Sequence, residues 1–149
     1  MMATYFSYGS SMHVDQMTRR VSSASKVGRA RLHGSKMVFN KRSADGSGKA
    51  NLVDSPEGIV WGVLYEIHYD DLQILDQYEV GYHRIGVCVY AEKEPLTAYT
   101  HLSTNLTDRP LPYRWYKGLV LRGAYEHGLP DDYLAYLSNI ICMEEAETS

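Results

Sequence analysis

The N-terminal run from Tyr5 to Met12 is the first part of this chain that could bind a ligand. It reads Tyr5-Phe6-Ser7-Tyr8-Gly9-Ser10-Ser11-Met12. A short apolar strand stops at Gly9, small hydroxyl residues follow, and a helical turn is expected from Val14. The first N–H groups of a helix lack partners inside it, and the helix dipole favours an anion beside them. A plain Gly-Ser turn between two ordinary elements is the alternative.

The carboxylate best suited to proton transfer is Glu79. Leu72 and Leu75 predict the core-facing stripe of a short helix over 71–78, N-capped by Asp70-Asp71, with Glu79 on that stripe or at its C-terminal end. Burial or the negative end of the helix dipole would raise its pKa, and such a carboxyl can both accept and donate a proton. The alternative is a glutamate that turns outward or pairs with Arg84; His83 is another candidate partner.

The other residue patterns in the sequence are weaker evidence of a functional site. The 6 histidines show no metal-ligand spacing, so no metal site is expected. Gly9-Ser10-Ser11 is neither a dinucleotide fingerprint nor a Walker loop. Cys88 and Cys142 are predicted to be buried free thiols. The basic pairs Arg19-Arg20 and Lys41-Arg42 are interpreted as solvated surface. An aromatic group is either a core edge or a binding wall; it comprises Tyr113, Trp115 and Tyr116.

Bulk properties narrow the class of protein. A length of 149 residues predicts one domain over 1–149 with a real core. The net charge of −3 argues against nucleic-acid binding, and no apolar run is long enough to cross a membrane. No secretory signal is visible, which predicts a cytoplasmic protein. The 13 tyrosines suit pocket walls and interfaces and are compatible with a homodimer.

The elements that must position these residues follow from local patterns. Strands are expected over 3–8, 30–40, 50–54, 59–67, 85–91 and 96–102, with a hairpin loop over 43–49 and a turn over 55–58. Helices are expected over 71–78, over 113–127 with Gly128 as C-cap, and from Pro130 onward. In the last helix, Tyr133, Leu137, Ile140 and Ile141 should face the core, and the acidic tail 144–149 should fray. Strands first and longer helices last indicate an α+β fold.

Three stretches, in order and at compatible spacing, resemble the γ-glutamylcyclotransferase-like proteins. The first is Tyr5-Phe6-Ser7-Tyr8-Gly9-Ser10-Ser11-Met12, which resembles the family's Tyr-Gly-Ser-Asn loop. The second is Val60-Trp61-Gly62-Val63-Leu64-Tyr65, followed by Leu75-Asp76-Gln77-Tyr78-Glu79 and Tyr82-His83-Arg84. The third is Tyr116-Lys117, then Gly123-Ala124-Tyr125-Glu126-His127-Gly128-Leu129-Pro130 and Tyr133.

The resemblance implies a small, mixed β-barrel with flanking helices and a substrate pocket at its rim. It makes Glu79 the general acid/base, and it requires neither metal nor cofactor. The substrate-binding residues that it implies are Tyr5, Phe6, Ser7, Tyr8, Gly9, Ser10, Ser11, His101 and Tyr116. Two of them depart from the family pattern: Ser11 stands where asparagine is usual, and His101 stands where a tyrosine is often found.

The function expected from this resemblance is release of 5-oxoproline from a γ-glutamyl compound. Attack of the substrate's own α-amine on its γ-carbonyl needs one group that removes a proton and later returns one, which suits a single carboxyl. Two alternatives remain open at this point. The same fold could act on another donor, such as a γ-glutamylamine or a biosynthetic intermediate, or it could be a non-catalytic small-ligand-binding module.

Overall fold

Five strands close into a mixed barrel. The computed structural model describes residues 1–144, and its strands are β1 (Met2–Ser7), β2 (Ser25–Arg42), β3 (Gly48–His68), β4 (His83–Ala91) and β5 (Glu94–Leu102). Their order around the barrel is β1-β3-β2-β4-β5. Neighbouring strands are antiparallel except β1 and β5, which meet in parallel where Tyr5 pairs with Tyr99. The expected barrel with flanking helices is therefore confirmed.

The β2–β3 hairpin is longer and more continuous than the sequence predicts. The predicted hairpin loop is present but shorter than expected, because β2 ends at Arg42 and β3 already begins at Gly48, which leaves residues 43–47 between them. The turn predicted over 55–58 is wrong, because β3 runs through it as one strand. His33 pairs with Ile59 and Ser35 pairs with Asp54, so residues 55–58 face only Gly34 on the partner strand. The excess residues are accommodated as a bulge rather than as a chain reversal.

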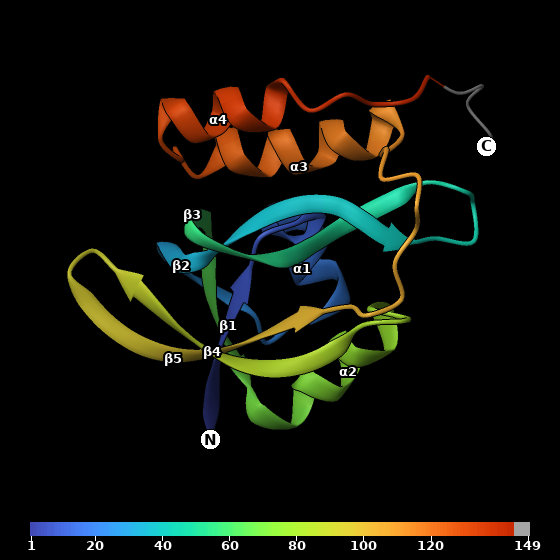
Figure 1. The fold of residues 1–149 in the computed structure, drawn as a ribbon. Coiled ribbons are helices and arrows are strands. Elements are labelled where there is room, and N and C mark those ends of the chain that lie inside the picture. The colour runs from blue at the N-terminus through green and yellow to red at the C-terminus, as the bar shows by residue number, and fades with distance from the viewer. Residues whose placement is uncertain (145–149) are drawn as a thin grey trace.

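Four helices lie around the barrel: α1 (Val14–Arg20), α2 (Leu72–Tyr78), α3 (Arg114–Glu126) and α4 (Asp131–Ser138). Figure 1 shows α3 and α4 side by side over the β2–β3 hairpin, with α2 at the opposite side of the barrel. Short 3-10 turns at Ser10–Met12 and Tyr69–Asp71 lead into α1 and α2. The β4–β5 hairpin extends away from the helices (Figure 1).

One of the two helix caps predicted from the sequence is present in the structure, and the other is not. Gly128 has φ 62°, its N–H donates to Tyr125 O, and the next N–H donates to Ala124 O. This pattern confirms the predicted C-cap. Asp71 makes no cap hydrogen bond, contrary to expectation. Its carboxylate instead accepts a hydrogen bond from Ser23 Oγ at 2.7 Å.

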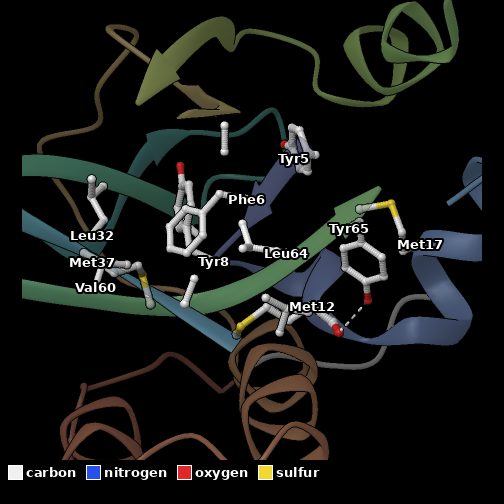
Figure 2. Packing of buried hydrophobic residues seen from close by; sticks show 14 of the residues in the cluster. Tyr5, Phe6, Tyr8, Met12, Met17, Leu32, Met37, Val60, Leu64 and Tyr65 are labelled. Atoms are coloured by element: carbon white, nitrogen blue, oxygen red, sulfur yellow. Dashed lines mark hydrogen bonds between the residues drawn. The ribbon is translucent and has the colours of Figure 1, made fainter. Parts of the chain in front are cut away.

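The core lies inside the barrel and beneath α3 and α4. Figure 2 shows Phe6, Leu64 and Val60 among its packed side chains. Tyr133 and Leu137 are buried as predicted, and Ile140 packs partly against the core. Ile141 is wrongly predicted, because α4 ends at Ser138 and leaves this side chain 74% exposed.

Both cysteines are more exposed than the sequence predicts. Cys88 is exposed on β4 and Cys142 is half-buried, so their predicted burial is wrong, although both are free thiols. Successive strand residues face opposite sides, which leaves Cys88 outside while Val89 is buried.

Most of the predicted fraying tail, residues 145–149, lies outside the described residues. Within residues 1–144, no helix has the length and apolarity needed to cross a membrane.

Candidate active site

A cavity of about 350 Å³ opens where β1 ends. It is bounded by the loop after β1, by α1, by the end of α2, by the β2–β3 hairpin and by the start of α3. Its lining residues are Tyr5, Ser7, Tyr8, Gly9, Ser10, Ser11, Gln16, Arg20, Lys41, Ser43, Lys49, Ala50, Tyr78, Glu79, Val80, Tyr82, His101, Trp115, Tyr116 and Leu119. Glu79 and the Gly9–Ser11 loop therefore share one cavity, although about 70 residues separate them in the sequence.

Phe6 is the one predicted binding residue that does not line this cavity. Its side chain is fully buried. Its ring lies so close to Gly62 that a Cβ on that glycine would come within 2.8 Å of it. Figure 2 shows Phe6 among the packed core side chains, apart from Tyr5. Because neighbouring strand residues point to opposite faces, Tyr5 and Ser7 face the cavity and Phe6 faces the core.

The loop after β1 is held in place through Met12. Its N–H donates to Gly9 O at 3.1 Å, which closes the 3-10 turn. Its carbonyl oxygen accepts from Tyr65 Oη at 3.1 Å and lies 2.6 Å from His127 Nε2. Helix α3 approaches so closely at Gly123 that a Cβ there would lie 2.8 Å from Met12 Cβ. This packing fixes the Gly9–Ser11 loop, which lines the cavity.

Ser11, one of the two departures from the family pattern, has a partner in the cavity wall. Its Oγ lies 2.6 Å from Ser7 Oγ, and both side chains are buried. The two hydroxyls thus bond one another across the loop. Ser11 lines the cavity, and its hydrogen bond ties the loop to the end of β1.

Glu79 sits at the C-cap of α2, one residue beyond the helix. Its N–H donates to Leu75 O at 2.9 Å, and its side chain is 19% exposed. Burial raises the pKa of this carboxyl, and the nearby cations Arg20 and Lys41 oppose that rise. The alternative prediction of an ion pair between Glu79 and Arg84 is wrong, because Arg84 lies 3.4 Å from Asp76 instead. The ion pair of Glu79 is with Arg20, at 3.7 Å.

Arg20 and Lys41 line the cavity, although the sequence suggested that both lie on the solvated surface. Arg20 lies over the Tyr78 ring at 4.9 Å and Lys41 over the Tyr82 ring at 5.2 Å, and both line the cavity. Lys49 lies 4.3 Å from the centre of the Tyr116 ring. The sequence contains one sign that a basic side chain lies in the cavity. Adjacent strand residues point to opposite faces, so Lys41 and Arg42 cannot both face solvent when one face of the strand is covered.

Tyrosines form much of the remaining wall. Burial raises the pKa of Tyr116 to about 12 and raises those of Tyr5, Tyr8 and Tyr82 well above the ordinary tyrosine value. Tyr82, absent from the predicted site, donates to Ala50 O at 2.6 Å. These phenols are neutral near pH 7. They can donate or accept hydrogen bonds, but they do not compete with Glu79 as a base.

The site therefore has the features of a general acid–base enzyme for a small polar substrate. A carboxyl with a raised pKa faces neutral phenols, fixed cations and the start of a 3-10 turn within a cavity of small-molecule size. Within residues 1–144, no three His, Cys, Asp or Glu side chains group as a metal ion would need.

Comparison with known proteins agrees with this class. The AIG2-like family matches residues 59–137. Over 146 residues the chain is 31% identical to the γ-glutamylcyclotransferase of Homo sapiens and 32% identical to that of Bos taurus. Each alignment covers 91% of this chain and 77% of the relative. A solved γ-glutamyl cyclotransferase superposes with a TM-score of 0.92 at 28% identity, covering 99% of this chain and 93% of that one.

This chain belongs to the AIG2-like family, whose matched curated relatives are γ-glutamylcyclotransferases. The sequence-based assignment to a γ-glutamylcyclotransferase-like enzyme is confirmed.

Proposed function

We propose that this protein releases 5-oxoproline and a free amine from a γ-glutamyl compound. The observation that carries the proposal is the shared cavity of Glu79 and the Gly9–Ser11 loop, with burial raising the pKa of the carboxyl. Such a reaction needs a proton acceptor, a proton donor and stabilisation of a carbonyl oxygen, all around one small substrate. The relatives' names agree with this chemistry.

Glu79 is the group proposed to move the protons. The substrate's α-amine is an ammonium at neutral pH, so the Glu79 carboxylate first removes one proton from it. The amine nitrogen then attacks the γ-carbonyl carbon and forms a tetrahedral intermediate. The C–N bond to the leaving amine breaks as the Glu79 carboxylic acid returns a proton to that nitrogen. The ring nitrogen still holds two hydrogens, and the regenerated Glu79 carboxylate takes one of them and passes it to the leaving amine, which departs as an ammonium. The carboxyl ends ionised as it began, and the products are 5-oxoproline and the protonated amine.

The loop after β1 is proposed to bind the γ-glutamyl group. The γ-carbonyl oxygen gains negative charge during attack, and N–H groups at the start of the 3-10 turn can donate to it. Because the attacking amine and the carbonyl belong to one molecule, holding the substrate folded supplies part of the rate. Tyr8, Ser10 and Tyr116 line the same wall and limit the conformers that fit.

The charges of the cavity favour a leaving group that carries a carboxylate. Glu79 is partly offset by Arg20 at 3.7 Å, whereas Lys41 and Lys49 stand over aromatic rings at the same cavity. Lys49 is also near Asp45, at 3.4 Å. These cations would attract the carboxylate of an amino acid or peptide and offer nothing to a neutral amine. We therefore propose a γ-glutamyl amino acid or peptide as substrate rather than a γ-glutamylamine.

The deciding assay measures 5-oxoproline released from γ-glutamylglycine, γ-glutamylethylamine and glutathione. We expect release from at least one compound whose leaving group carries a carboxylate, and slower release from γ-glutamylethylamine. Glu79→Gln should abolish release, whereas Glu66→Gln, an exposed glutamate on β3, should not. No release from any of the three would contradict the proposed activity. It would favour a non-catalytic ligand-binding module, and equilibrium dialysis with γ-glutamylglycine would then report binding without turnover.

The lysines offer a separate test of the leaving group. Lys41→Gln should raise KM for γ-glutamylglycine and leave KM for γ-glutamylethylamine nearly unchanged, since only the first substrate has a carboxylate on its leaving group. Lys93→Gln is the matched control, because Lys93 is exposed in the β4–β5 turn. An equal rise in KM for both substrates would show that Lys41 does not bind the carboxylate of the leaving group.

A further inference from the structure

A line of hydrogen bonds runs from the cavity wall through the barrel to α2. Tyr5 on β1 places its Oη 2.6 Å from His101 Nδ1 on β5. The other ring nitrogen, His101 Nε2, lies 2.8 Å from Asp76 Oδ1 on α2. Tyr5 and His101 are each only 3% exposed, and both line the cavity. Asp76 is half open to solvent and also faces Arg84 at 3.4 Å.

The partners at the two ends decide where the hydrogens lie. An ionised carboxylate can only accept, so Asp76 requires a hydrogen on His101 Nε2. In the neutral ring, Nδ1 then has a lone pair and can only accept. The Tyr5 hydroxyl must donate to it, and its oxygen keeps lone pairs for the cavity. Tyr8 leaves this arrangement undisturbed, because its hydroxyl donates to His101 O at 2.6 Å.

A hydrogen-bond acceptor at this position suits the substrate's α-ammonium. The substrate's α-ammonium carries three hydrogens, and Glu79 is the only carboxyl group among the cavity-lining residues of the described chain. Arg20, Lys41 and Lys49, the lysines and arginine that line the cavity, are donors that would repel an ammonium. Tyr5 and Glu79 line the same cavity, and the Glu79 carboxylate adds to the effect of burial in raising the pKa of the Tyr5 phenol.

We propose that His101 and Asp76 are positioning residues that hold the Tyr5 oxygen as a hydrogen-bond acceptor for the substrate's α-ammonium, beside Glu79. The proposal rests on the proposed function, because the ammonium belongs to a γ-glutamyl substrate. It also gives a role to His101, at which this chain departs from the tyrosine often found in the family. The amine would thereby be recognised and held close to the carboxylate that deprotonates it.

A double-mutant cycle tests the proposal, with KM for γ-glutamylglycine as the readout. Tyr5→Phe and His101→Phe should each raise KM about tenfold, because each removes one hydrogen bond to a charged group or its orientation. His101→Phe should add almost nothing in the Tyr5→Phe background, since His101 acts through Tyr5. Independent, multiplying effects would overturn the proposal. Tyr133→Phe is the control, because Tyr133 is a buried tyrosine on α4 outside the cavity.

A ligand without the amine separates recognition from general damage to the site. Glutarylglycine is γ-glutamylglycine without its α-amine, and it cannot cyclise. Tyr5→Phe should leave its inhibition constant unchanged while raising KM for the amine-bearing substrate. Equal weakening of both ligands would refute recognition of the ammonium.

The hydrogen positions can be read in the wild-type protein, without a variant that must fold. Nitrogen-15 NMR of the His101 ring should show a protonated Nε2 and an unprotonated Nδ1 at neutral pH. The opposite tautomer, or a ring protonated on both nitrogens, would overturn the proposal, because Tyr5 would then have to accept from the ring. Wild-type enzyme that releases no 5-oxoproline would contradict the proposed function instead, and the NMR result would be unaffected by that failure.

Discussion

Replacing Glu79 by glutamine is the most demanding test of the mechanism. The change keeps the size of the side chain but removes both the proton acceptor and the proton donor. General acid–base catalysis contributes roughly 10²–10⁴-fold to a rate. The cavity supports the upper end of that range, because its tyrosines are neutral and no second carboxyl lines it within residues 1–144. We expect kcat/KM to fall about 10⁴-fold, equivalent to about 5 kcal/mol of activation free energy.

The same substitution should stabilise the fold. Burial raises the pKa of Glu79 in the folded state, so its ionised form opposes folding above that pKa. Glu79→Gln should therefore unfold at a higher urea concentration than wild type at neutral pH. The difference should shrink as the pH falls from above the raised pKa toward the ordinary glutamate value, because the wild-type carboxyl is then neutral in both states. Lost activity with gained stability is the signature of a site that tolerates an unfavourable charge for function.

Two measurements decide the outcome. Release of 5-oxoproline gives the rate, and urea unfolding at several pH values gives the free energy of unfolding, with Glu66→Gln as control. Unchanged release by Glu79→Gln would refute its role as the acid/base. A variant that is less stable than wild type at neutral pH would refute the reasoning that burial, rather than the pair with Arg20, dominates at Glu79.

Three further predictions follow from the same contacts. Wild-type kcat/KM should fall as the pH drops through the raised pKa of Glu79, because only the ionised carboxyl removes the first proton; a flat acid limb would contradict this. Arg20→Gln should move that limb to higher pH, since Arg20 lowers the pKa of Glu79, whereas Arg19→Gln should leave the pH profile in place. Gly62→Ala should lower the melting temperature by several degrees, because its Cβ would lie 2.3 Å from Ser7 O; calorimetry showing no change would mean that the backbone shifts without cost.

Much of the architecture could be predicted because its causes are local. Gly128 ends α3 because the left-handed conformation there suits glycine and allows neighbouring N–H groups to satisfy the last carbonyls. Leu72 and Leu75 face the core because their spacing matches the helical period. The pairing of β4 with β5 follows from a short connection between two apolar strands. In each case, residues a few positions apart contain the information.

The errors arose where the answer depends on strand register. Pro56 and Gly58 are typical of a turn, but the partner strand holds β3 extended and leaves residues 55–58 as a bulge. Cys88 has the apolar neighbours of a core residue, yet its side of β4 faces outward. Ile141 continues the helical spacing beyond the point where α4 ends. Local patterns indicate which residues are apolar, and the register decides which of them are buried.

The sequence by itself determined the family, the elements and the two halves of the candidate site, because motifs and periodicity are properties of neighbouring residues. Only the tertiary structure decided how those halves meet. Barrel closure brings Tyr5 to His101 across 96 positions, packs Asp76 behind that ring, and places Arg20 rather than Arg84 beside Glu79. Contacts of that kind depend on chain closure and strand register, which composition and spacing along the chain do not specify.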